Sequence, residues 1–576
     1  MTYKVITATL TARTAVHIGS GEGNDLTDAL VRRGADGQPF IPGTAIAGVL
    51  RALLTRLAPR LGENCCVVLA ETSAERNKSC SCAVCRLFGD VNPTDEEGST
   101  SSASRLLVFN ARPSGTLPCL LIRDGVGIDR VTGAAARAGA VKFDLEVLPA
   151  GATFELRMEL RDSGLEDERL LAAGLAEWKA GRLWLGGRVA RGLGAFDLHN
   201  LQFKTLSLDT PAQILAFLKD DKPWQQAQPV DGWLRERLNS ISFAPADGKP
   251  EAVARGWLSL AGTLQAEGAL LTNDTLAAGA SGFDHAPLLV RWGEWKSPVL
   301  TGAGLRGVLR SHAERLARTL VTLQATGKED FLRCCPACDP NVRDNDKERK
   351  QPLESCDSLL KKANIPGNDE DIAGSLCLAC RLFGSPRLGS RLIVEDAPYQ
   401  PTEKQSRPVL KILDFLAIDR FTGGGVEGAK FDALALWRPA FVLRLHLENP
   451  EPWELGWLWL VLRDLSEGWL TVGFGGAKGF GRVKLTDWTV TFGHLLPEDA
   501  PPGLTQLGLA TKESGVYTTV TVTSATGGWS SLVQKWVNAF HETVKQFQRP
   551  EQIELTEDSY FGRVDELYPV MKGGAQ

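Results

Sequence analysis

Long hydrophobic runs are absent from this sequence. No stretch reaches the roughly 18 uninterrupted apolar residues that a membrane-spanning helix needs. The first residues, MTYKVITATLTART, lack the basic and then apolar layout of a secretory signal peptide. We therefore expect a cytoplasmic protein without a membrane partner.

A large excess of one charge is also missing. The 64 Lys and Arg residues stand against 69 Asp and Glu residues, which gives a formal net charge of −5. This balance argues against a simple basic protein that coats nucleic acid. The segment from 495 to 576 has ten acidic and six basic residues, so it carries −4 of the −5. The remainder is nearly neutral, and local basic grooves are compatible with it.

Twelve cysteines are present, and without an export signal they are not expected to form disulfides. Cys335-x-x-Cys338 and Cys377-x-x-Cys380 form a set of two plus two, typical of a tetrahedral thiolate zinc site. A second set has Cys80, Cys82 and Cys85, with Cys66 or Cys65 as a distant fourth ligand. Because four thiolates leave no open position, both zinc ions would be structural. Buried free thiols are the alternative, and Cys119 and Cys356 have no evident partners.

One pattern is written twice along the chain, which predicts two homologous domains. An arginine-ended segment stands early in each copy, GTAIAGVLR at 43–51 and GAGLRGVLR at 302–310. The later matches keep their order, and they are CxxCRLFG at 82–89 and 377–384, SRL at 104–106 and 390–392, IDRxTG at 128–133 and 418–423, and KFD at 142–144 and 430–432. The offset between copies drifts, so the domains differ by inserted loops.

Both copies have the same series of hydrophobic periodicities. Alternating apolar residues predict an opening strand near 6–12 and 257–266, and a later strand near 154–160 and 441–448. A helix with one apolar face follows Thr44, which we expect to cap it. A second helix follows the later strand in both copies. The order predicts an α+β protein of two tandem ferredoxin-like (RRM-like) domains, each with inserted loops and a zinc-binding insertion.

A glycine-rich turn follows the second helix of each copy, GGRVARGLG at 186–194 and GFGGAKGFG at 473–481. Backbone amide donors next to a cation suit phosphate binding. A tight hairpin without a ligand is the alternative. The candidate contacts are Gly187, Arg191, Gly192, Gly476, Lys478 and Gly479.

Together with the HIGSG turn at 17–21 and the IPG at 41–43, these motifs resemble the RAMP superfamily, and in particular the backbone subunits of type III CRISPR effector complexes. Two such domains in one chain are similar to the double backbone subunit of type III-D systems. The resemblance implies a first RAMP domain over 1–205, a linker over 206–254 and a second RAMP domain over 255–495. The segment 496–576 resembles nothing known and is expected to be a C-terminal extension of unknown role.

Membership implies that each domain binds CRISPR guide RNA and holds the complementary target RNA on the opposite side. It also implies contacts with other backbone subunits, a small subunit and a large polymerase-like subunit. Since the guide supplies the specificity, the protein would contact phosphates and 2′-hydroxyls. Arg51 and Arg310, at equivalent places on the first helix, are candidate guide-phosphate contacts. A solvated surface cation is the alternative for both.

In the family, target RNA is cut at a loop after the first strand, where an aspartate precedes a short apolar and basic strand. Asp28 directly precedes such a segment and is the best match, with Asp25 as the fallback. Asp284 is the counterpart in the second copy, although it lies two residues further from its arginine. A magnesium or other divalent ion can be held by one carboxylate together with substrate phosphate oxygens. The substrate's own 2′-hydroxyl would then be the nucleophile of a transesterification.

Other assignments stay open at this point. His285 is a candidate for proton transfer, with a structural role as the alternative, and the Asp-Arg pairs at 129–130 and 419–420 are expected to fix the loops that follow them. A scaffold with inert aspartates is the closest rival function. A nuclease that matures the guide precursor is disfavoured by seven histidines with none in a repeated motif. A zinc-dependent DNA-binding regulator is disfavoured because no basic recognition helix follows the cysteines.

Overall fold

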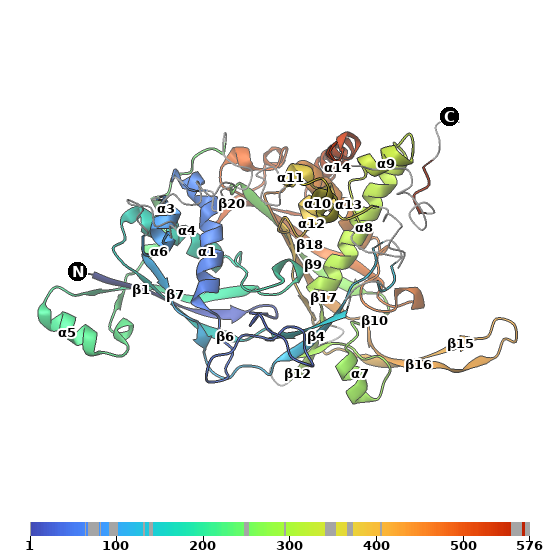
Figure 1. The fold of residues 1–576 in the computed structure, drawn as a ribbon, viewed down its shortest axis with the longest axis horizontal. Helices are drawn as coiled ribbons and strands as arrows, with labels where there is room; N and C mark the ends of the chain where they lie inside the picture. Colours follow the sequence, from blue (N-terminus) through green and yellow to red (C-terminus); the bar gives the residue numbers. More distant parts are fainter. Residues whose placement is uncertain are drawn as a thin grey trace.

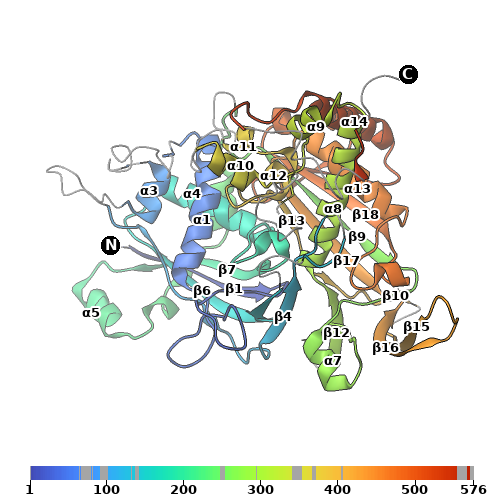
Figure 2. The same ribbon diagram turned by 45° about the vertical axis from the view of Figure 1, so that its right-hand side comes forward.

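The computed structural model describes residues 2–63, 65–66, 80, 82–90, 102–130, 133–136, 142–246, 253–292, 295–339, 353–365, 372–403, 406–553 and 567–570. Two antiparallel sheets dominate the fold, one in the first half (residues 2–246) and one in the second half (253–570). Helices cover a face of each sheet, and the two halves lie side by side in both views (Figures 1 and 2). No helix among the described residues has the length and apolar character of a membrane span.

The first half follows the order predicted from its periodicity. Its main elements are β1 (Thr2–Ala12), α1 (Gly43–Leu57), β2 (Leu106–Val108), β6 (Thr153–Leu160), α4 (Leu165–Lys179) and β7 (Phe196–Ser207). The sheet order is β2-β6-β1-β7, with β8 (Gln228–Pro229) beyond β7 and β3 (Arg112–Pro113) also paired with β6. Alternate residues of β1 such as Ile6 and Leu10 are fully buried, as the alternation predicts.

The second half repeats this arrangement. Its matching elements are β9 (Gly256–Ala266), α8 (Gly302–Thr322), β13 (Leu392–Val394), β17 (Ala440–Glu448), α13 (Pro452–Ser466) and β18 (Val483–His494). They form a sheet in the order β13-β17-β9-β18. The same strands in the same order confirm the predicted duplication of a mixed α/β unit.

The first helix of each half begins at an equivalent place, and α1 is not capped by the residue that the sequence predicts. Thr44 does not cap α1, which begins at Gly43 after Pro42; instead the Gly43 amide donates to Asn110 Oδ1 at 2.9 Å. In the second half the Gly302 amide donates to Asp396 Oδ1 at 2.8 Å. A side chain from the loop after the second strand therefore satisfies the first free amide of both helices, and Thr44 is left exposed in the first turn.

Smaller elements complete each half. In the first half they are the helices α3 (Ala83–Phe88), α5 (Pro211–Lys219) and α6 (Trp233–Asn239) and the 3₁₀ turns η1 (Ala58–Leu61), η2 (Val189–Arg191) and η3 (Pro223–Gln225). In the second half they are β10 (Ala269–Leu270), α7 (Thr275–Ser281), β11 (Leu289–Trp292), β12 (Trp295–Leu300), α9 (Lys328–Cys334), α10 (Cys356–Lys362), α11 (Ile372–Ser375), α12 (Leu378–Phe383), β14 (Ala397–Pro398) and η4 (Gly476–Lys478). The segment 206–254, expected to be a linker, contains β8 and α6. These two elements pack on β7 and α4 of the first half.

The C-terminal extension is built into the second half. Its elements are η5 (Pro497–Asp499), η6 (Thr505–Leu507), β19 (Thr511–Ser514), β20 (Tyr517–Thr523) and α14 (Trp529–Gln546). β20 pairs with the edge of β18, and β19 pairs with β20, so the sheet gains two strands. α14 packs on α13, where the rings of Phe540 and Trp457 stack at 5.1 Å.

Each half also carries a long hairpin, and the two hairpins have different surroundings. The first hairpin, β4 (Leu121–Val126) with β5 (Lys142–Val147), packs its Leu121 against an apolar cluster of the second half. The second hairpin, β15 (Leu410–Ile418) with β16 (Gly425–Trp437), projects away from the body of the molecule at the right of Figure 1.

The glycine-rich turns pack against the segment that follows the first strand. A Cβ on Gly186 would lie 2.4 Å from the carbonyl oxygen of His17, and a Cβ on Gly473 would lie 2.4 Å from that of Leu271. Both glycines have positive φ, at 94° and 81°. A side chain at either place would therefore strain the backbone and push the two segments apart.

Gly186→Ala should lower the thermal unfolding midpoint by at least about 3 °C, because it adds roughly 1–3 kcal/mol of strain. The matched control is Gly187→Ala, whose Cβ would meet nothing closer than 3.5 Å. We expect a shift below about 1 °C for that variant. Differential scanning fluorimetry of both proteins measures this, and equal midpoints would contradict the close approach.

Candidate metal centres and nucleic-acid interface

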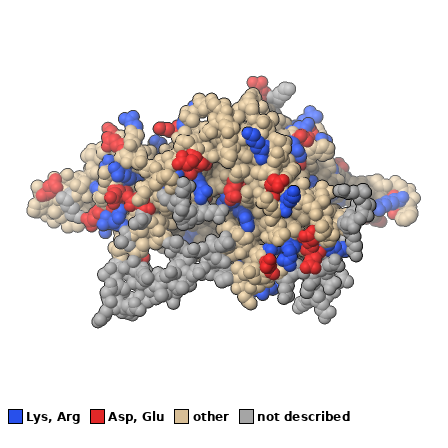
Figure 3. Space-filling view, turned by 90° about the horizontal axis from the view of Figure 1, so that it is seen from above, with Lys and Arg blue, Asp and Glu red and all other residues tan. Residues whose placement is uncertain are grey.

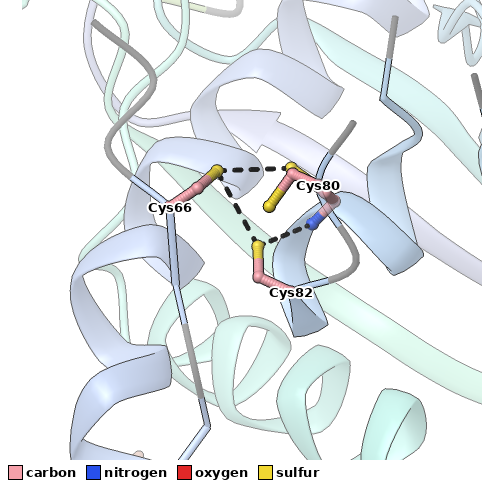
Figure 4. A group of neighbouring side chains, drawn as sticks. Cys66, Cys80 and Cys82 are labelled. Carbon is pink, nitrogen blue, oxygen red and sulfur yellow. Dashed lines mark hydrogen bonds between the residues drawn. The ribbon is translucent and has the colours of Figure 1, made fainter. Parts of the chain in front are cut away.

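Four cysteines of the first half converge between α1 and β2. The sulfur atoms of Cys66, Cys80, Cys82 and Cys85 all lie within 4.8 Å of one another. Cys66 Sγ is 3.4 Å from Cys85 Sγ and 3.8 Å from Cys82 Sγ. A tetrahedral zinc with Zn–S bonds of about 2.3 Å places its sulfurs roughly 3.8 Å apart. The group fits that geometry, and Figure 4 shows Cys66, Cys80 and Cys82 pointing toward one another.

The second group differs by one residue from the set expected from spacing. Cys338, Cys356, Cys377 and Cys380 are buried with their sulfurs within 4.8 Å, and Cys338 Sγ is 3.5 Å from Cys380 Sγ. Cys335 lies outside the group because its Sγ turns to the Ala337 carbonyl oxygen, to which it donates at 3.3 Å. Cys356, the first residue of α10, takes its place. Cys356 belongs to no CxxC motif, so the spacing of cysteines in the sequence did not indicate it as a metal ligand.

Hydrogen bonds from neighbouring thiols lower the pKa of one cysteine in the first group, Cys82, and of two in the second, Cys338 and Cys377. The Cys65 thiol lowers the pKa of Cys82, and the Cys356 thiol lowers the pKa of Cys338. The Cys85 amide also donates to Cys82 Sγ at 3.4 Å. Zinc binds the thiolate form of cysteine. The lowered pKa values therefore favour zinc binding at both groups.

Arginines surround both cysteine groups, and two of them were expected to contact guide phosphates. Arg51 Nη2 donates to Cys85 Sγ at 3.3 Å, and Arg310 Nη2 donates to Cys380 Sγ at 3.8 Å. Arg310 also donates to Glu314 Oε1 at 2.7 Å and to the Gly384 carbonyl oxygen at 3.2 Å. Some of the N–H donors of Arg51 and Arg310 are therefore bonded to groups at the cysteine sites and do not face a phosphate.

The second group has an additional arginine from the C-terminal extension. Arg549 is 5% exposed, and its Nη1 lies 3.8 Å from Cys356 Sγ. Its backbone amide donates to the Arg333 carbonyl oxygen at 2.9 Å, which fixes the segment after α14. A cation beside a zinc tetrathiolate compensates part of its charge of −2.

Asp28 and Asp284 occupy equivalent positions in the two halves. Asp28 Oδ2 accepts a hydrogen bond from the Asp144 amide at 2.8 Å, and Asp284 Oδ2 accepts one from the Asp432 amide at 2.9 Å. Both aspartates are exposed. Asp25 is also exposed, on a turn in which Asn24 Oδ1 accepts from the amides of Leu26 and Thr27.

Each loop aspartate lies beside further carboxylates that the sequence reasoning did not single out. Asp144 stands opposite Asp124 in the first hairpin, and Asp432 stands opposite Asp414 in the second. Burial and a hydrogen bond with Asp124 raise the pKa of Asp144. The repeated KFD motif was the available signal, because Asp144 and Asp432 end its two copies. Adjacent carboxylates of this kind suit a divalent cation.

A cation from each glycine-rich turn packs on a phenylalanine of the neighbouring hairpin. The Arg188 guanidinium stands 4.3 Å from the Phe143 ring centroid, and Lys478 Nζ stands 4.2 Å from that of Phe431. The two phenylalanines directly precede Asp144 and Asp432. In the first half this ring contact comes from Arg188, whereas Arg191 is the candidate phosphate contact.

The remaining candidate phosphate contacts have different environments. Gly187, Arg191, Gly476, Lys478 and Gly479 are exposed. Gly192 is buried, and a Cβ on it would lie 2.7 Å from the Cα of Gly302 in the second half. Its amide donates to the Val189 carbonyl oxygen at 3.0 Å. Gly192 therefore packs between the two halves, because the first glycine-rich turn lies against the start of α8.

The two aspartate loops differ at the next residue. His285 follows Asp284, whereas Ala29 follows Asp28, and both residues form a parallel bridge to their hairpin. The His285 ring lies 4.3 Å from that of Phe474, and its buried Nδ1 has no hydrogen-bond partner among the residues that the structure describes. The second loop thus has an imidazole where the first has a methyl group.

Charge on the helical side of the molecule is mixed. Figure 3 shows Lys and Arg interspersed with Asp and Glu over this face, without a broad region of one sign. A nucleic acid bound through its phosphates needs clustered cations. This view therefore offers no broad basic surface, and the cations of the glycine-rich turns remain the better candidates for contacts with phosphate.

Comparison with known proteins identifies one family. The family model of the RAMP superfamily matches residues 9–197 and 285–484, which is more than half of the chain and falls once in each half. No curated protein matches significantly.

The purified protein should contain two zinc ions per chain, one in each cysteine group. We expect Cys82→Ser to lose the first and Cys356→Ser to lose the second. Cys335→Ser is the matched control and should keep both, because its sulfur lies outside the group. Inductively coupled plasma mass spectrometry counts the metal. Retention of two zinc ions by Cys356→Ser would contradict the assignment.

Arg549→Met should release the second zinc at least about tenfold faster, because it removes a cation beside the thiolates while keeping most of the side-chain volume. Arg51→Met is the control and should speed release from the first group only. A chromogenic chelator follows both rates. Unchanged release from Arg549→Met would show that the C-terminal segment does not support the site.

Proposed function

Because the chain belongs to the RAMP superfamily, we propose that it is a guide-RNA-binding backbone subunit of a type III CRISPR interference complex that also cleaves target RNA. The superfamily includes CRISPR-associated RNA-binding proteins. The observation that carries the proposal is the repeated site, in which an exposed aspartate accepts a hydrogen bond from a hairpin aspartate in each half.

We assign a ferredoxin-like fold to each half. The order β2-β6-β1-β7 and its counterpart β13-β17-β9-β18 support it, with one helix after the first strand and one after the third. Two units in one chain support a double backbone subunit of the type III-D kind. The proposed partners are guide RNA, target RNA, other backbone subunits, a small subunit and a large polymerase-like subunit, and the proposed location is the cytoplasm.

In the proposed reaction, Asp28 and Asp284 act on target RNA that is paired with the guide. Magnesium or another divalent ion, when bound, would stabilise negative charge on the phosphate. The backbone amides of Asp144 and Asp432 hold the two loop aspartates, and the Asp432 carboxylate accepts a hydrogen bond from the Asp284 amide at 2.9 Å. The carboxylates of both hairpin aspartates would add oxygen ligands for the ion. The 2′-hydroxyl next to the cut phosphate would attack it, and the 5′-oxygen of the next nucleotide would leave. DNA should therefore resist cleavage.

The two cysteine groups are assigned to structural zinc. Each lies in the insertion between the first helix and the second strand of its half, and the second group is buried. Four thiolates fill the coordination shell, so the metal would take no part in the cleavage. The zinc ions would hold the insertions against α1 and α8.

A non-catalytic scaffold for guide RNA is the second candidate function. Basic and acidic residues are interspersed on the surface in Figure 3, and Arg51 and Arg310 donate to a cysteine and a carboxylate of the chain itself. Both observations are equally compatible with a scaffold. The two functions differ only in whether the aspartates are required for cleavage.

Asp28→Ala and Asp284→Ala should each abolish one cut, with a fall of at least about 100-fold in the rate at that position. The matched control is Asp25→Ala, an exposed neighbour that should cut normally. The assay uses the complete complex, labelled target RNA and magnesium, with guide content measured in parallel. Normal cutting by both variants with guide RNA bound would leave the scaffold function in place.

A further inference from the structure

The carboxylates around Asp28, which form the first site, lie against a helix of the second half. Thr275, the first residue of α7, donates a hydrogen bond from its hydroxyl to Asp124 Oδ2 on β4. On the same strand, Leu121 packs against an apolar cluster of the second half that includes Leu288. The strands β4 and β12 lie close together in both views (Figures 1 and 2). The second half therefore touches the first site at one of its carboxylates.

The hydroxyl of Thr275 is available because another residue caps α7. Asp274 Oδ1 accepts hydrogen bonds from the amides of Leu276 and Ala277, both at 3.0 Å. The Asp274 amide donates to the Ala286 carbonyl oxygen at 2.9 Å, which fixes the start of the helix to the segment that follows it. The Thr275 side chain is thus held at a defined place and is not needed by its own helix.

Asp124 is one of three carboxylates at the first site. It stands opposite Asp144 in the hairpin, and the Asp144 amide donates to Asp28 Oδ2 at 2.8 Å. Like charges at directly opposite positions of a hairpin repel each other. A hydroxyl that donates to Asp124 stabilises its charged form and fixes the orientation of its carboxylate. One residue of the second half thus sets the orientation of a carboxylate beside Asp144.

The equivalent carboxylate of the second site is held by its own hairpin. Asp414 stands opposite Asp432, as Asp124 stands opposite Asp144. Lys430 Nζ lies 3.4 Å from Asp414 Oδ1, and both of these side chains are largely exposed. This hairpin projects away from the body of the molecule (Figure 1). The two sites therefore differ in that the other half of the chain contributes to the first.

A purely structural role for Thr275 is the alternative. The two halves are already joined by ion pairs, among them Arg123–Asp396 on the same strand and the buried pair Arg60–Asp499. A single hydroxyl on an exposed residue adds little to such a contact. Loss of the Thr275 hydroxyl should therefore leave the halves joined and change only the surroundings of Asp124.

We propose that Thr275 is a positioning residue for the cut at the first site, because its hydroxyl holds the Asp124 carboxylate beside Asp144 and Asp28. The proposal rests on the proposed function, since it presupposes that target RNA is cut next to Asp28. The first cut then requires a residue from each half of the chain. The second cut, at Asp284, does not depend on Thr275.

The test compares Thr275→Val, which keeps the shape of the side chain and removes the hydroxyl, with Thr275→Ser, which keeps the hydroxyl. The assay uses the complete complex, labelled target RNA and magnesium, and Asp28→Ala and Asp284→Ala identify the two cut positions. Thr275→Val should lower the rate of the first cut at least about tenfold. Thr275→Ser should restore most of that rate, and the second cut should be unchanged in both. Equal rates of the first cut for the two variants would overturn the proposal.

The matched control is Leu276→Ala, which alters the next residue of α7. The Leu276 side chain is 58% exposed, so its loss should leave both cuts at their normal rates. A slower first cut in this variant would show that any change in α7 disturbs the site and would contradict a specific role of the Thr275 hydroxyl.

A second measurement on the full-length chain needs no cutting of RNA. Ferrous ion in place of magnesium generates hydroxyl radicals with ascorbate and hydrogen peroxide, and these break the polypeptide close to the ion. We expect breaks near residues 28 and 144 and near residues 284 and 432. Thr275→Val should reduce the first set at least about threefold, because oxygen ligands must be correctly placed to hold a small divalent ion. The second set should stay the same, and loss of both sets or of neither contradicts the positioning role.

The positioning role and the proposed function fail in different ways. If Asp28→Ala abolishes the first cut while Thr275→Val cuts at the normal rate, the positioning role fails and the proposed function stands. If Asp28→Ala cuts normally at every position, the proposed function fails, and the role of Thr275 in the cut fails with it.

Discussion

The arrangement of this protein depends on arginines of the first half that pair with carboxylates of the second. Five such pairs are Arg13–Glu395, Arg56–Glu448, Arg60–Asp499, Arg123–Asp396 and Arg130–Glu314. Arg60 and Asp499 are almost completely buried, so separation of the halves would leave uncompensated charges. In all five the cation comes from the first half. The pairing fixes how the two similar domains meet, and because all five cations come from one side the contact is asymmetric.

This contact makes two equivalent sites unequal. The first hairpin is held against the second half by Arg123 and Arg130, so the carboxylates around Asp28 lie near the junction of the domains. The second hairpin is exposed to solvent at its tip, and the carboxylates around Asp284 lie at its base. His285 adds an imidazole to the second site alone. A duplicated sequence thus yields two sites with different surroundings.

The same need to compensate charge links the cysteine groups to the rest of the fold. Arg51 and Arg310 stand beside the thiols at equivalent places, and Arg549 reaches the second group from the C-terminal extension. The extension also adds β19 and β20 to the sheet and packs α14 on α13. It is part of the second domain's core, although the RAMP family model does not extend over it.

The sequence by itself determined the duplication, the order of the main strands and helices and three of the four cysteines of the first group, because alternation and short motifs are local patterns. The choice of Cys66 over Cys65 as the fourth came from the tertiary structure. It also selected Asp28 and Asp284 through a local resemblance, and their roles remain predictions. Tertiary structure decided that Cys356 and not Cys335 joins the second group, that Gly192 packs between the halves, and that Asp144 and Asp432 lie beside the loop aspartates. These outcomes depend on residues far apart in the chain, whose proximity follows from how the sheets and hairpins pack and has no signature in local spacing.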